Sequence, residues 1–145
     1  MPEERLLVRA YTRKLLDLEI ASTGYSRDIS DDHEPLVNYV RSTSNRRSFC
    51  LQCIAASMDA EPVTPSYIVN QLGVSRNAVD TMIQECESNG WIVVDRDERE
   101  FRTMYSADLM VKAYMEYAEW VSETSTRLGF ADIQASLRLL KSMTK

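Results

Sequence analysis

Residues 67–79, YIVNQLGVSRNAV, place the end of one helix, a tight turn and the start of another helix side by side. Gly73 can adopt the left-handed backbone conformation of such a turn, because glycine has no Cβ atom to clash. Ser75 is a typical helix N-cap residue. Val74, between them, is expected to fill the space between the two helices. This stretch therefore predicts two helices joined by a glycine turn, with the second helix free to protrude.

Further elements are predicted on both sides of this turn. A buried helix starts near Asn45, and Thr64 and Pro65 open the next helix as N-cap and first helical residue. Apolar residues at helical spacing continue to residue 86, and Asn89 with Gly90 ends that helix. Two short strands, 91–94 and 101–105, then flank a charged turn. Three helices and a hairpin predict a winged helix-turn-helix.

Amphipathic helices are predicted on both sides of this region, so the fold class is mainly α. One helix is expected from about residue 3 to 22, and two more follow Ser106, which is predicted to cap the first of them. We divide the chain into N-terminal helices (1–44), the winged helix-turn-helix (45–105) and C-terminal helices (106–145), intertwined as one domain. The outer helices carry wide apolar stripes, which are typical of interfaces. They are therefore predicted to hold a homodimer.

Residues 51–105 resemble the winged-helix domain of MarR-type transcription regulators. The similarity is carried by residues 67–79 and by residues 82–92, MIQECESNGWI, where the family has a helix, a glycine and an apolar strand start. Outside this region only the order of the helices matches. The resemblance implies a homodimer that binds pseudo-palindromic double-stranded DNA. It also implies that a small aromatic effector or cysteine oxidation releases the DNA.

Candidate DNA contacts lie where a winged helix meets the duplex. Arginines at the start of the first winged-domain helix, at the start of the recognition helix and on the hairpin would contact phosphates. Polar residues on the exposed side of the recognition helix could read base edges. The predicted DNA-binding set is Arg46, Arg47, Ser75, Arg76, Asn77, Thr81, Gln84, Arg96, Arg99 and Arg102.

The negative charge of the chain argues against DNA binding. The net charge is −5, and residues 45–105 carry 6 basic and 9 acidic groups. Asp80 stands where the family commonly has a basic or hydroxyl residue, and Glu85 where a basic residue is common. Phosphate neutralisation supplies most non-specific DNA affinity, so that affinity is expected to be weak. The alternative is a winged-helix protein-interaction module, an adaptor or anti-repressor that does not bind DNA.

Other functions find little support in the sequence. The motifs of phosphate-binding loops, serine hydrolases and zinc proteases are absent, so the chain is not expected to be an enzyme. The single histidine, His33, has only Asp31, Asp32 and Glu34 nearby, without metal-ligand spacing, so neither a metal nor a cofactor is expected. No membrane span or signal peptide is recognisable, which predicts a cytoplasmic protein.

Two groups of residues keep alternative interpretations open. The three cysteines are expected to pack in the core. The alternative is a redox switch, which would need an exposed thiol with a low pKa. The aromatic side chains of the first C-terminal helix could line an effector pocket, but packing in the core or the dimer interface is the more ordinary role. These residues are Cys50, Cys53 and Cys86, and Tyr114, Tyr117 and Trp120.

Overall fold

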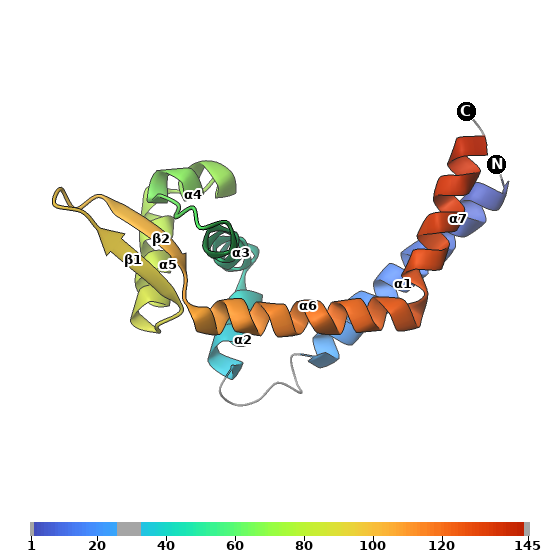
Figure 1. The fold of residues 1–145 in the computed structure, drawn as a ribbon, viewed down its shortest axis with the longest axis horizontal. Coiled ribbons are helices and arrows are strands. Elements are labelled where there is room, and N and C mark those ends of the chain that lie inside the picture. The colour runs from blue at the N-terminus through green and yellow to red at the C-terminus, as the bar shows by residue number, and fades with distance from the viewer. Residues whose placement is uncertain (1, 26–32, 144–145) are drawn as a thin grey trace. The chain divides into compact units, whose positions relative to one another are not determined.

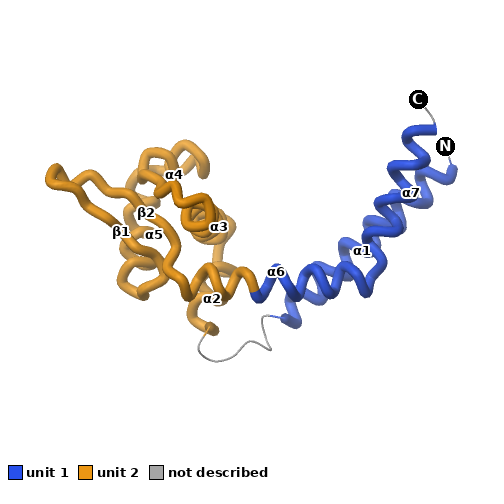
Figure 2. The backbone as a smooth tube through the Cα atoms, in the orientation of Figure 1, with its two compact units in different colours: residues 1–29, 116–145 blue, residues 30–115 orange. Residues whose placement is uncertain are grey.

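The computed structural model describes residues 2–25 and 33–143 and divides the chain into two compact units (Figure 2). Unit 1 comprises residues 1–29 and 116–145, and unit 2 comprises residues 30–115. Helices dominate the fold, and a single two-stranded antiparallel sheet is present in the described residues. The predicted fold class, mainly α with a winged helix-turn-helix, is confirmed.

Unit 2 contains the winged helix-turn-helix (Figure 1). Helix α2 opens the unit, α3 to α5 form the predicted trihelical part, and the hairpin follows before the first turns of α6. The bounds are α2 (Glu34–Ser42), α3 (Ser44–Asp59), α4 (Pro65–Leu72), α5 (Arg76–Ser88), β1 (Ile92–Arg96), β2 (Arg102–Ser106) and α6 (Asp108–Leu128).

The caps that the sequence predicts are present at the central turn. The Tyr67 backbone N–H donates to Thr64 Oγ1 at 3.1 Å at the start of α4. Gly73 ends α4 in the left-handed conformation, with φ of 65°. The Ala78 N–H then donates to Ser75 Oγ at 3.1 Å, which starts α5. Each of these bonds satisfies a helix-end group that has no partner within its own helix.

The core of unit 2 forms where α3, α4, α5 and β2 meet. Helix α5 buries one apolar face, and the opposite face stays exposed to solvent. A closely packed core of this kind fixes the direction of each helix, because the interdigitated side chains leave few voids. The largest fully buried side chains are Phe49, Ile68, Ile83, Met104, Met110 and Val79.

The hairpin is joined to the helices by an additional bridge. Strands β1 and β2 pair antiparallel from Ile92 opposite Ser106 to Arg96 opposite Arg102. Val63, in the loop before α4, exchanges two backbone hydrogen bonds with Met104 at 2.9 and 2.8 Å. The wing and the loop that leads into α4 therefore share one backbone network.

Ser106 corrects one sequence prediction. It was expected to cap the helix that follows, but it is the last residue of β2 and is buried. Its hydroxyl donates to the Ala107 carbonyl rather than accepting from a helix N–H. The Ala107 carbonyl accepts the N–H groups of Met110 and Val111, so the helix starts one residue later without a side-chain cap.

Unit 1 consists of α1 (Pro2–Tyr25), the second part of α6 and α7 (Phe130–Met143). Tyr11 packs edge-on against Phe130, with ring centroids 5.5 Å apart. Helix α1 buries none of its described residues within the chain, although it is one of the longest helices. No described helix is long and apolar enough to cross a bilayer.

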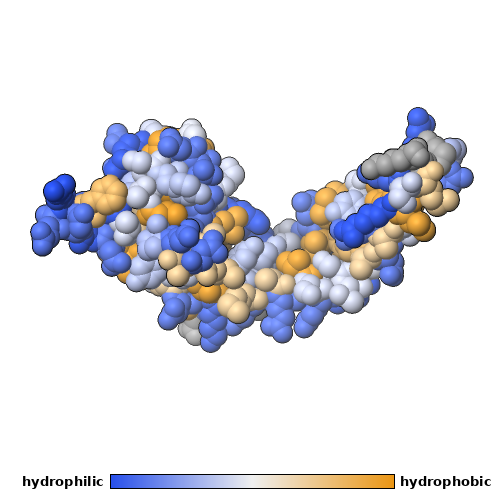
Figure 3. Space-filling view, turned by 45° about the horizontal axis from the view of Figure 1, so that its top comes forward, coloured by the Kyte–Doolittle hydropathy of each residue, from blue (hydrophilic) through white to orange (hydrophobic). Residues whose placement is uncertain are grey.

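Large apolar side chains are exposed on α1 and α7. Leu6 and Ile20 of α1 are 66% and 65% exposed, and Leu139 and Met143 of α7 are 64% and 72% exposed. Figure 3 shows hydrophobic residues at the surface of unit 1. Apolar surface of this extent is typical of an interface. Unit 1 of a single chain therefore leaves much of its apolar surface in contact with water.

Replacing Gly73 tests the turn that sets the direction of α5. Gly73→Ala is expected to lower the free energy of unfolding by about 1–2 kcal/mol, because a Cβ atom is strained in the left-handed region. The added Cβ would meet no atom within 4 Å, so a steric clash does not contribute. Urea unfolding measures the change.

Gly73→Asn is the matched control, since asparagine tolerates the left-handed conformation better than alanine does. The asparagine variant should lose less stability than the alanine variant. Equal losses for both variants would contradict the backbone-strain explanation.

Candidate nucleic-acid interface

The exposed face of α5 carries the polar residues that the sequence assigns to base reading. Asn77, Thr81 and Gln84 are all exposed and lie within one stripe of the helix. The Thr81 hydroxyl donates to the Asn77 carbonyl at 3.0 Å, so its oxygen can still accept a hydrogen bond. Amide and hydroxyl groups of this kind can pair with base edges in the major groove.

Asp80, on the same helix, joins two of the predicted arginines. Arg102 of β2 lies 2.7 Å from Asp80 Oδ1, and Arg76 Nε lies 3.5 Å from the same oxygen. Arg76 also reaches Ser66 Oγ of α4 at 3.4 Å. The hydrogen bond from Arg102 is the main cause that lowers the pKa of Asp80 below its ordinary value. The carboxylate thus holds the wing and the start of α5 together.

The other two acids of α5 are also paired with arginines from outside the helix. Arg46 of α3 lies 3.0 Å from Glu85, and its guanidinium stacks over the Tyr39 ring at 4.8 Å. Arg96 of β1 donates both terminal nitrogens to the Glu87 carboxylate at 3.0 and 2.9 Å. This bidentate bond is the main cause that lowers the pKa of Glu87. Each acid of α5 therefore binds a basic residue of a neighbouring element.

Arg47 and Arg99 differ from these four arginines. Within the described residues, neither guanidinium makes a hydrogen bond or an ion pair. Arg99 lies at the tip of the hairpin, where Asp97 Oδ1 accepts the backbone N–H groups of Arg99 and Phe101 at 2.8 Å each. A fixed tip with a free guanidinium is suited to contact a phosphate.

The structure therefore gathers Arg46, Arg76, Arg96 and Arg102 around α5, and leaves Arg47 and Arg99 apart from that cluster. Ser75 also lies here, and its hydroxyl oxygen accepts the Ala78 N–H as the N-cap of α5. Sequence reasoning did not identify Glu87 as a partner of the wing. Glu87 and Arg96 are nine residues apart on either side of a turn, and no known sequence pattern predicts an ion pair at that spacing.

The cysteines lie in the core of unit 2, as predicted. Cys50, Cys53 and Cys86 are free thiols with 1%, 0% and 0% exposure. A hydrogen bond with Cys86 and burial raise the pKa of the Cys50 thiol, and burial raises the pKa of Cys53. The hydrogen bond with Cys50 instead lowers the pKa of the Cys86 thiol. All three thiols are buried, and buried cysteines pack as small apolar side chains.

Two aromatic residues of α6, Tyr117 and Trp120, form a cluster with Tyr25 in unit 1. The Trp120 ring lies 5.0 Å from Tyr25 and 6.0 Å from Tyr117, between centroids. Rings this close contact each other directly and leave no space for a ligand between them. Burial is the main cause that raises the pKa of Tyr25, with Glu116 adding to it. Tyr114, the third aromatic residue of α6, belongs to unit 2 and is exposed.

Metal-binding groups give no further candidate. No cluster of three or more histidine, cysteine or acidic side chains that could hold a metal ion occurs among the described residues. Of the acids that flank His33 in the sequence, Asp31 and Asp32 lie outside that part of the chain.

Solved structures share this fold, whereas no protein-family model and no curated protein sequence matches the chain. MepR, a transcription regulator of the Staphylococcus aureus multidrug efflux pump MepA, is similar with a TM-score of 0.54 and 13% identity, over 87% of this chain and 93% of MepR. The chain has the fold of MarR-type transcription regulators.

A second structure with the MarR-type fold is that of the heme sensor protein PefR from Streptococcus agalactiae. Its complex with heme and carbon monoxide gives a TM-score of 0.50 and 12% identity, over 91% of this chain and 90% of PefR. At identities this low the similarity establishes the MarR-type fold and no individual binding residue, since one fold can serve many functions.

The Asp80–Arg102 contact can be tested by its effect on a pKa. A carboxylate whose pKa is lowered in the folded state stabilises the fold above its unfolded-state pKa of about 3.9, and that contribution is lost as the pH falls through the lower, folded-state value. Arg102→Gln removes the largest cause of the shift. The pKa of Asp80, measured by NMR titration of its side-chain carboxyl, should therefore rise towards about 3.9.

Arg99→Gln is the control, because it removes the same charge from the wing without touching Asp80. An Asp80 pKa that stays unchanged in Arg102→Gln, or that moves equally in both variants, would refute the contact.

Proposed function

We propose that this chain is a sequence-specific DNA-binding transcription regulator that acts as a homodimer and is not an enzyme. The observation that carries the proposal is the exposed face of α5. There Asn77, Thr81 and Gln84 are exposed on the same helix as Asp80, whose carboxylate contacts Arg76 at the helix start and Arg102 on the wing. A protruding helix with polar groups flanked by basic side chains is the arrangement that reads a major groove.

The local balance of charge supports this proposal despite the net charge of −5. Four arginines surround the three carboxylates of α5, and Arg47 and Arg99 add two further cations. The remaining acids of residues 45–105 lie on other elements, namely Asp59, Glu61, Asp95, Asp97, Glu98 and Glu100. Because the α5 acids already hold arginines, phosphates compete with carboxylates for these cations. The affinity for a specific site should therefore exceed the affinity for random DNA by a wide margin.

The exposed apolar surface of unit 1 supports the homodimer. Helix α1 has no buried residue in the single chain, and α7 exposes Leu139 and Met143. Two-fold pairing lets the same patch of each copy cover its counterpart. Regulators that read pseudo-palindromic sites need such a pair, because each half-site takes one recognition helix.

Arg76→Gln and Arg99→Gln test the proposed contacts with DNA. Each is expected to weaken binding to a fragment selected from native genomic DNA by about 1–3 kcal/mol, if the guanidinium makes a bidentate contact. Both side chains are exposed, so stability should change by no more than about 0.5 kcal/mol. Fluorescence anisotropy with labelled duplex measures the affinity.

Lys112→Gln is the matched control, because it removes one positive charge from an exposed site on α6 of unit 2. It should bind DNA almost as the parent does. If both arginine variants also bind as the parent does, the regulator proposal fails. A parent protein that binds no genomic fragment would instead favour the interaction-module alternative.

Leu6→Glu and Ile20→Glu test the homodimer. A buried charge in an apolar interface is costly, so each variant should weaken dimerisation at least about tenfold, or 1.4 kcal/mol. Analytical ultracentrifugation at micromolar concentration measures the shift towards monomer.

Met58→Glu, at an apolar residue of α3 that is 66% exposed, is the control and should leave the dimer intact. A parent chain that sediments as a monomer under these conditions would contradict the proposed assembly.

A further inference from the structure

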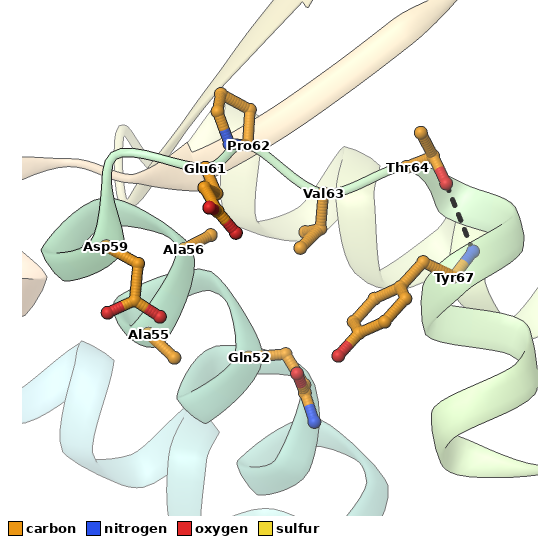
Figure 4. Close-up of a pocket in the computed structure, with 9 residues that line it drawn as sticks. All are labelled: Gln52, Ala55, Ala56, Asp59, Glu61, Pro62, Val63, Thr64 and Tyr67. Carbon is orange, nitrogen blue, oxygen red and sulfur yellow. Dashed lines mark hydrogen bonds between the residues drawn. The ribbon is translucent and has the colours of Figure 1, made fainter.

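Unit 2 contains a cavity that none of the predicted site residues lines. It has a volume of about 360 Å³ and lies between the C-terminal half of α3, the loop 60–64 and the first turn of α4. Small-molecule sites commonly occupy about 300–1,000 Å³. The side chains of Gln52, Glu61 and Tyr67 converge on this space from three different segments (Figure 4).

The wall of the cavity is held by backbone bonds. Ala60 ends α3 in the left-handed conformation, with φ of 55°, and turns the chain back. The Glu61 N–H donates to the Ala56 carbonyl at 3.0 Å, and Val63 is bonded in both directions to Met104. The Tyr67 N–H is bonded to Thr64. The loop therefore keeps its shape without a ligand, which lowers the cost of binding.

The charge of the cavity is negative and unneutralised. Asp59 and Glu61 both line it, and neither carboxylate has a hydrogen bond or an ion pair with any described residue. The acids of α5 in the same unit are each bound by an arginine. The two cavity carboxylates thus attract a cation and repel an anion.

The rest of the lining favours an organic cation over a metal ion. Ala55, Ala56, Pro62 and Val63 present apolar surface, and Tyr67, which is 43% exposed, lines the space beside them. A tyrosine ring attracts quaternary ammonium groups through its π face. Hard metal ions instead require six or more oxygen ligands, and no cluster of three or more acidic, histidine or cysteine side chains suited to a metal occurs in the described part of the chain.

We propose that this cavity is a binding site for a small organic cation with an apolar group, such as an aralkylammonium ion. The cationic nitrogen lies between the carboxylates of Asp59 and Glu61 and the Tyr67 ring, and the apolar group packs on the alanine and valine side chains. The site does not depend on DNA binding, so it can be tested whether or not the regulator proposal holds.

Benzyltrimethylammonium is a suitable probe, added to the full-length protein labelled with ¹⁵N. We expect saturable chemical-shift changes at millimolar probe concentration, concentrated in the backbone amides of residues 52–67. Benzyl alcohol, which has the ring without the charge, and benzoate, which has the opposite charge, should each bind more weakly than the cation does.

Charge-neutral variants test the role of the carboxylates. Asp59→Asn and Glu61→Gln should each weaken binding of the cation about threefold, and the double variant about tenfold, as expected for partly exposed ion pairs. Tyr67→Leu should also weaken it, because it keeps apolar surface but removes the π face. Glu98→Gln, which removes the same charge from the wing, is the matched control and should bind as the parent does.

Three results would overturn the proposal. They are shift changes that do not saturate or that map outside residues 52–67, equal binding of the cation by the parent and the double variant, and binding of benzyl alcohol as tight as that of the cation. The ¹⁵N spectrum of each variant shows whether the chain remains folded, so loss of binding through unfolding is distinguished directly.

Discussion

Burial of one face of α5 is the constraint on which the rest of unit 2 depends. Val79, Met82, Ile83 and Cys86 leave almost no surface exposed, so the helix can sit in the core in one rotational setting. That setting fixes which side chains face outwards. The turn at Gly73 and the cap at Ser75 fix where the helix begins, and the apolar contacts fix how it is rotated. The candidate interface is a consequence of this packing.

The elements of unit 2 are predictable because their signals are local. A cap such as Thr64 acts on an N–H three residues away, and Gly73 acts on its own backbone, so both can be read from a short stretch of sequence. Ser106 shows the limit of such signals. The pairing of β2 with β1 extends to this residue and overrides its tendency to cap a helix.

The charge pairing around α5 could not be predicted in the same way. Arg46 and Glu85 are 39 residues apart and Arg102 and Asp80 are 22 apart, so only the folded chain brings them together. In the sequence the acids of α5 count against DNA binding. In the structure each one also fixes a neighbouring arginine, which holds α3 and the wing against the helix. The cavity beside Tyr67 was likewise hidden, because the turn at Ala60 that forms it has no glycine to mark it.

The bridge between Val63 and Met104 has a consequence for the edges of the wing. It covers part of the outer edge of β2, while no described strand pairs with the outer edge of β1. An open strand edge can recruit a strand from another molecule and start aggregation. Strand β1 is only five residues long and ends in Asp95 and Arg96. Arg96 also forms an ion pair with Glu87. The short, charged end of β1 thus protects the wing from edge-to-edge association.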